Sequence, residues 1–139
     1  MSAAFSPEER ERIRLQLLEA AGRHARQEGM RRVSVDTLAQ ECGISKGAFY
    51  HFYETKELLF LDMLKQHYRR IAELAARECR DSADLPAVER AARVFRTALA
   101  AMGDAAMMRF IHDEVPLLLR KLPDDVLREH FQSIEDFIR

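Results

Sequence analysis

One stretch of the chain, residues 34–53 (SVDTLAQECGISKGAFYHFY), constrains the fold more than any other. Residues 35–42 place apolar side chains on one face at helical spacing. Gly43 can end that helix, because glycine adopts the left-handed backbone conformation without a Cβ clash. Ser45 offers a hydroxyl that can cap a second short helix over residues 46–52. This order predicts a helix-turn-helix, the motif whose second helix can lie in the major groove of DNA.

The residue types on the second helix bear on whether it binds DNA or only packs against its neighbours. Two short helices joined at a glycine occur in many all-α proteins, so the shape alone leaves both interpretations open. Lys46, Tyr50 and His51 are unusual choices for a surface that only has to face water. Gly47 lowers helix propensity by roughly 1 kcal/mol relative to alanine, and close approach of the backbone to a phosphate or a base would explain its presence. These residues favour DNA binding.

Residues 44–60 (ISKGAFYHFYETKELLF) resemble the TetR family of bacterial transcriptional regulators. In that family a Ser-Lys-Gly run followed by a tyrosine opens the recognition helix, and this chain has the run at residues 45–47 with Tyr50. A Thr-Lys-Glu-x-Leu run opens the next, long helix, as residues 55–59 do here. The resemblance extends over roughly the first 65 residues. It implies a sequence-specific transcriptional regulator, by family default a repressor released from its operator by a small-molecule inducer.

The resemblance also implies which residues contact DNA. Tyr50 and Lys56 are expected on the phosphate backbone, His51 closer to the bases, and Lys46 on a guanine edge or a phosphate. The whole expected set is Ser34, Thr37, Ser45, Lys46, Gly47, Tyr50, His51 and Lys56. The family binds double-stranded DNA as a homodimer on a palindromic operator, with recognition helices ~34 Å apart or somewhat more.

Several positions depart from the family pattern. The family usually has a Leu-Phe pair where this chain has His24 and Ala25, which removes core volume. Phe49 stands where the family often has a smaller aliphatic residue, and we expect it to fill part of that gap. Phe52 replaces a common His or Tyr, and its side chain either contacts a sugar or thymine methyl or turns into the core.

Hydrophobic periodicity predicts an all-α fold. The resemblance implies an N-terminal three-helix helix-turn-helix DNA-binding domain over residues 1–54 and an α-helical regulatory domain for ligand binding and dimerisation over residues 55–139. The expected helices span residues 7–28, 35–42, 46–52, 55–79, 86–102, 105–113 and 117–119, with a last helix opening at residues 123–125. Asp84 is expected to cap the helix that starts at Pro86. The apolar stripe of that helix, which includes Val88, Phe95 and Leu99, is expected to face inward.

The second domain carries methionines and aromatic residues that can line an adaptable apolar pocket. His67 and His112 would be the polar groups of such a pocket. The expected lining, alternatively plain hydrophobic core, is His67, Tyr68, Phe95, Met102, Met107, Met108, Phe110, His112 and Phe131. The expected effector is a small apolar or amphipathic molecule.

The sequence stops within an apolar helical pattern at Phe137 and Ile138. Members of the TetR family usually carry about two more helices, which form most of the dimer interface. We therefore expect the chain to be a portion of a longer protein, truncated at its C-terminus. The alternative is a dimer built in a different way.

Composition excludes several classes of function. The net charge of −1 gives DNA binding no support, so that prediction depends on locally placed cations. The chain has no run of 18 apolar residues, and its start is polar, so we expect a cytoplasmic protein without a membrane span. Cys42 and Cys79 have no metal-ligand spacing and are read as reduced, buried thiols. No cofactor or metal is expected.

Two rival functions are weaker. An enzyme is disfavoured because the sequence shows no nucleophile–base constellation, glycine-rich phosphate loop or paired catalytic acids. A helical protein-interaction module would use the methionine-rich face to bind a partner peptide. Absence of sequence-specific DNA binding, together with tight capture of one protein, would favour that module.

Overall fold

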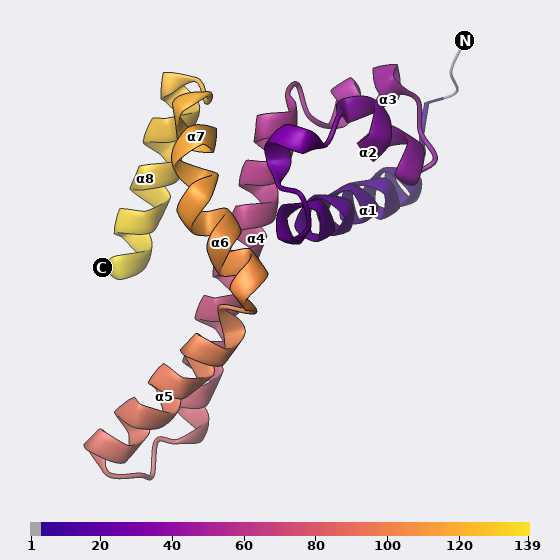
Figure 1. Cartoon of the computed structure of the whole chain (residues 1–139). Coiled ribbons are helices and arrows are strands. Elements are labelled where there is room, and N and C mark those ends of the chain that lie inside the picture. Colours follow the sequence, from indigo (N-terminus) through magenta and orange to yellow (C-terminus); the bar gives the residue numbers. More distant parts are fainter. Residues whose placement is uncertain (1–3) are drawn as a thin grey trace.

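The computed structural model describes residues 4–139, except for the side chains of Phe137 and Ile138. Over these residues it contains helices and no strands, which confirms the all-α fold class. The elements are α1 (Pro7–Arg26), a 3₁₀ turn η1 (Met30–Arg32), α2 (Val35–Glu41), α3 (Lys46–Phe52), α4 (Lys56–Asp81), α5 (Ala87–Ala101), α6 (Ala105–Asp113), α7 (Val115–Arg120) and α8 (Asp124–Ile138). Helices α2 and α3 lie over α1 at one end of the molecule (Figure 1).

Each of the first four α-helices begins at a serine or threonine cap, and the cap at Ser45 is the one expected above. Ser6 accepts a hydrogen bond from the backbone of Glu9, whose carboxylate accepts one from the backbone of Ser6. Ser34, Ser45 and Thr55 each accept a bond from the amide three residues later. Each cap satisfies an amide that has no partner inside its helix.

Several helix boundaries differ by one or two residues from those expected. Helix α1 ends at Arg26, two residues early, and Gly29 takes a φ of 87° to turn the chain into η1. The expectation that Asp84 caps α5 is wrong, because Pro86 is the N-cap and no side chain bonds to that end. The preceding turn is instead stabilised by buried Ser82, whose hydroxyl donates to the Glu78 carbonyl at 2.6 Å.

One hydrophobic core joins the helix-turn-helix to the helices that follow it. Leu17 of α1, Leu38 of α2, Phe49 of α3 and Phe60 of α4 are all 0% exposed. The same cluster includes Phe110 of α6, whose ring centre lies 6.0 Å from that of Phe60. The core therefore crosses the predicted domain boundary at residue 54, and that division stays a prediction.

Helix α5 runs back along the C-terminal half of α4 and projects from the core (Figure 1). No residue of α5 is buried, so the expectation of an inward apolar face on this helix is wrong for the described residues. Val88 is 84% exposed and Phe95 64% exposed. The contact with α4 is partly polar, as Arg90 shows by donating to the Cys79 carbonyl at 2.7 and 2.9 Å.

Candidate nucleic-acid interface

Helix α3 presents its predicted DNA-contacting residues to solvent on the side opposite its buried anchor. Lys46, Gly47, Tyr50 and His51 are exposed, whereas Phe49 is 0% exposed in the core. The Tyr50 ring stands edge-on to the Phe49 ring, with 5.6 Å between centres. The buried Phe49 side chain thus determines which face of α3 points to solvent.

The fold itself does not require a glycine at position 47. A Cβ built there would meet only the Ser45 hydroxyl, at 3.9 Å, which is ordinary contact. Gly29 differs, because its φ of 87° and its close contact with Glu114 exclude a side chain. Gly47 keeps the first turn of α3 free of side-chain bulk although the fold has room for it, as a partner approaching the backbone would require.

The exposed lysine of α3 makes only a loose internal ion pair. Lys46 Nζ lies 3.4 Å from Asp36 Oδ2, with the two side chains 53% and 69% exposed. Surface pairs of this kind contribute roughly 0–1 kcal/mol, so a phosphate or a base edge can replace the carboxylate at little cost. At the start of α2 the exposed hydroxyls of Ser34 and Thr37 lie 2.9 Å apart.

Lys56 already has a role inside the protein. Its Nζ donates to the Val33 carbonyl at 3.0 Å, which ties the start of α4 to the segment before α2. An ammonium group has three donors, so this bond leaves two for other partners. A phosphate contact by Lys56 stays a prediction, and its structural role is one that the sequence reasoning missed.

Phe52 packs against α1, which decides between its two expected roles in favour of packing. Its ring centre lies 6.0 Å from that of Phe5, and the Arg10 guanidinium lies 5.2 Å above it. A hollow of about 650 Å³ opens beside this cluster and is lined in part by Arg10, Arg14 and His51. The lining also includes Glu11 and Asp62, which pair with Arg14 at 2.8 and 3.7 Å, so the charge of the hollow is mixed.

A short hydrogen bond holds the end of α3 to α4. The Tyr53 hydroxyl donates to Asp62 Oδ2 at 2.6 Å. Burial and this carboxylate both raise the pKa of Tyr53, so the phenol stays protonated as a donor. The sequence carried no recognisable signal for this pair, because its members come from different helices.

A polar network joins α1 to α2. His24 Nε2 lies 2.9 Å from Glu41 Oε1, its Nδ1 bonds to Glu28, and Arg23 donates to Glu41 at 2.8 Å. His24 is 7% exposed, so the residue expected to weaken the apolar stripe makes buried polar contacts instead. Partial burial raises the pKa of Glu41, but the bonds from His24 and Arg23 outweigh it and lower that pKa overall. The spacing of His24 and Glu28, four residues apart in the helix expected over residues 7–28, could have indicated this network.

The residues expected to line an effector pocket occupy three kinds of position. Met107 and Phe110 are core residues, 1% and 3% exposed. His67 is half-buried beside Gly103, and burial, helped by nearby cations, lowers its pKa. The exposed members are Tyr68, Phe95, Met102, Met108, His112 and Phe131.

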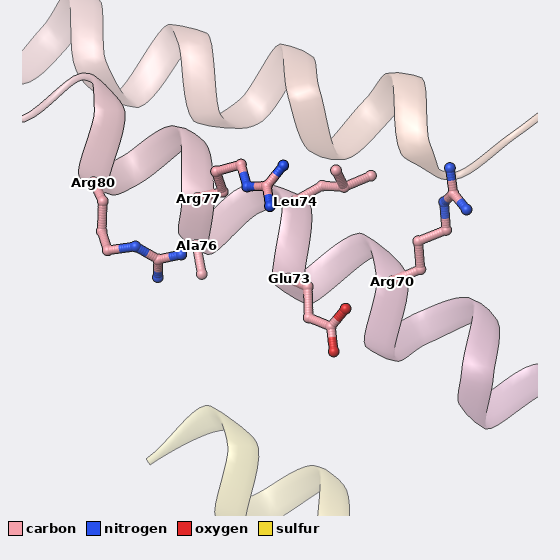
Figure 2. Close-up of a pocket in the computed structure, with 6 residues that line it drawn as sticks. All are labelled: Arg70, Glu73, Leu74, Ala76, Arg77 and Arg80. Carbon is pink, nitrogen blue, oxygen red and sulfur yellow. The ribbon is translucent and has the colours of Figure 1, made fainter.

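None of those residues lines the hollow found on α4. That hollow has a volume of about 460 Å³ and is lined by Arg70, Glu73, Leu74, Ala76, Arg77 and Arg80 (Figure 2). Its lining is basic rather than rich in methionine. The predicted apolar pocket therefore stays a prediction.

Residues 4–139 show neither a membrane span nor a metal site. No helix there is long and apolar enough to cross a membrane. Over the same part of the chain, no three His, Cys, Asp or Glu side chains converge as metal ligands. Cys42 and Cys79 are free and half-buried, and burial raises the pKa of the Cys42 thiol, which disfavours a reactive thiolate.

Known proteins match the region that contains this interface. The sequence pattern of the family described as "Bacterial regulatory proteins, tetR family" matches residues 17–63. The uncharacterized HTH-type transcriptional regulator YuxN of Bacillus subtilis is 44% identical over 52 residues, covering 37% of this chain and 18% of the relative. The HTH-type transcriptional repressor Rv1474c of Mycobacterium tuberculosis is 34% identical over 65 residues, covering 47% of this chain and 35% of the relative.

The matched relatives are much longer than the matched segments. The chain spans 18% of the length of one and 35% of the other. No solved structure matches. The likeness therefore concerns the helix-turn-helix and the start of α4.

Proposed function

We propose that the chain, whose residues 17–63 match the TetR family of bacterial regulatory proteins, binds a specific DNA sequence as a transcriptional repressor. Proteins of this family are DNA-binding transcription factors and not enzymes. One matched relative carries the name of a repressor. The observation that carries the proposal is the exposed set on α3 above a fully buried Phe49.

The geometry gives each group a separate task. The N-terminal turn of α3 enters the major groove, where Lys46 donates to a guanine edge or a phosphate. The bare backbone at Gly47 allows close approach, and His51 lies one turn further along the same helix. Ser34, Thr37 and Tyr50 contact phosphates and set the register, whereas base contacts supply the sequence preference.

One such helix makes too few contacts for useful specificity. The protein therefore acts as a homodimer on a palindromic operator, with the two α3 helices about one turn of DNA, ~34 Å, apart or somewhat more. A small apolar or amphipathic effector bound among the later helices releases it. Dimerisation and release by an effector follow the family pattern, and the regulator is a cytoplasmic protein.

Selection of bound sequences from a random duplex pool tests the proposal. We expect a two-fold symmetric site. Lys46→Ala and Tyr50→Phe should weaken binding to it without lowering the melting temperature. Each lost phosphate contact should also reduce the log–log salt slope by roughly one per subunit.

Lys121→Ala provides a matched control. Lys121 is 55% exposed and lies 3.9 Å from Glu57, which resembles the 53% exposure and loose pairing of Lys46. The control should bind as the wild type does. Unchanged affinity in both Lys46→Ala and Tyr50→Phe would contradict the proposal, and capture of one protein with no selected duplex would favour the interaction module.

A further inference from the structure

Glu114 occupies the junction between α6 and α7. Its backbone amide donates to the Phe110 carbonyl at 2.9 Å, and its own carbonyl accepts from the Leu118 amide at 2.8 Å. Both Phe110 and Leu118 are buried in the core. The side chain of Glu114 therefore starts from a backbone position that two anchored helices determine.

The Glu114 carboxylate reaches the segment that leads into the helix-turn-helix. Its Oε2 accepts a hydrogen bond from the Met30 amide at 2.9 Å, across 84 residues of sequence. Arg31 Nε lies 3.6 Å from Oε1. The residue is 7% exposed, and a buried carboxylate is costly unless such donors satisfy it.

Gly29 is fitted to this carboxylate. A Cβ at Gly29 would overlap Glu114 Oε1, and the φ of 87° also disfavours any other residue. Met30 is 0% exposed. Its amide therefore cannot replace the bond to Glu114 with a bond to water unless the core opens. The contact is an integral part of the fold rather than a transient surface ion pair.

The connector formed by residues 29–33 is thus held on two sides. Glu114 bonds to it at Met30, and Lys56 bonds to it at the Val33 carbonyl. Ser34, the cap of α2, follows immediately. Because the connector sets where α2 begins, both bonds fix the placement of α2 and α3 relative to the rest of the molecule.

We propose that Glu114 is a positioning residue for DNA binding, which couples the α6–α7 junction to the helix-turn-helix through Met30. The inference rests on the proposed function for its DNA readout. A shift of α6 and α7 must either break this bond or move the connector, and either change displaces α3. Glu114 is therefore the point at which later helices alter DNA affinity.

Glu114→Ala, in the full chain, is the principal test. On the duplex selected with the wild type, its affinity should fall roughly 3- to 30-fold. The salt slope should stay unchanged, because no phosphate contact is lost. Hydrogen exchange at the Met30 amide should accelerate. Glu114→Gln should restore most of the affinity, since its amide oxygen still accepts from Met30.

Asp113→Ala is the matched control. It removes the neighbouring carboxylate, which is 62% exposed and pairs only with the adjacent His112 among the described residues. It should leave both affinity and Met30 exchange at wild-type values. An equal loss in Asp113→Ala and Glu114→Ala would overturn the inference, because a general charge effect would then explain both.

The remaining outcomes are also decisive. Wild-type affinity in folded Glu114→Ala overturns the inference and leaves the proposed function intact. If Glu114→Ala does not fold, Glu114→Asp takes its place, since the shorter side chain withdraws the carboxylate from Met30, and unchanged affinity there overturns the inference. If the wild type selects no duplex, the proposed function fails. Hydrogen exchange at the Met30 amide then tests the coupling by itself, and unchanged protection of that amide in Glu114→Ala overturns the inference.

Discussion

The helix-turn-helix and the α4–α5 hairpin use similar apolar patterns with opposite results. Helix α3 has only seven residues but buries Phe49 completely. Helix α5 has 15 residues with apolar side chains at helical spacing, and none is buried. A periodic pattern thus predicts a helix in both regions, but burial depends on how many neighbours surround it. Helix α3 directs Phe49 into the shared core, whereas α5 packs against α4 outside that core.

The largest difference between the regions should appear when a large core aromatic is truncated. Phe60→Ala should reduce the free energy of unfolding by about 3–5 kcal/mol, because the side chain is 0% exposed and packs against Phe110. Urea denaturation followed by circular dichroism measures this. A loss below about 1 kcal/mol would mean that the core is far looser than its burial indicates.

The polar network between α1 and α2 should give the next largest effect. Glu41→Ala leaves the buried His24 ring nitrogen without its partner, which should cost about 1–3 kcal/mol. Thermal and urea unfolding of this variant, compared with Glu129→Ala on the exposed face of α8, check the value. Equal stability of the two variants would show that the network contributes nothing.

The same network predicts a direction for the pH dependence. The pKa of Glu41 is lowered in the folded state, so its contribution is fully present above the ordinary glutamate value of 4.5. It is lost as the pH falls through the folded-state pKa. Stability should therefore decline on acidification below the ordinary glutamate value, and less steeply in Glu41→Gln. Identical pH profiles would contradict this assignment.

Phe49→Leu probes the expected exchange of volume between α3 and α1. Phe49 is 0% exposed and His24 and Ala25 replace larger family residues, so the loss of volume should cost about 1–1.5 kcal/mol. The loss should exceed that of the same change in a relative that keeps the phenylalanine on α1. A shift in melting temperature near zero would reject the exchange.

The smallest effect should come from α5. Phe95→Ser should change the free energy of unfolding of this chain by no more than about 0.5 kcal/mol, because the side chain is 64% exposed. Urea denaturation of the chain is the measurement. A loss comparable to that of Phe60→Ala would show that α5 is packed in solution, which would remove the contrast between the two regions.

Much of the helix-turn-helix end could be predicted from local sequence signals. Ser34, Ser45 and Thr55 act as caps in the structure, and Gly43 adopts a φ of 68° as the turn requires. These features depend on residues three or four positions apart, which sequence patterns report directly. The exposed positions of Lys46, Tyr50 and His51 were expected for the same reason.

The contacts that hold this end in place were not predicted. The bonds from Lys56 to Val33, Tyr53 to Asp62 and Met30 to Glu114 join separate elements. Their donors and acceptors meet only when the helices pack, so no local spacing reports them. The burial expected for α5 failed for a related reason, since an apolar stripe does not say which neighbour will cover it.

The sequence by itself determined where the first four α-helices begin, which of them form the helix-turn-helix and which side chains α3 exposes to solvent. Those properties follow from caps, glycine conformations and side-chain spacing within single helices. Tertiary structure decided that Phe52 packs against α1, that His24 joins a polar network and that Glu114 bonds to the connector before α2. A hydrogen bond or a buried surface needs both partners in place, and only the folded chain brings distant residues together.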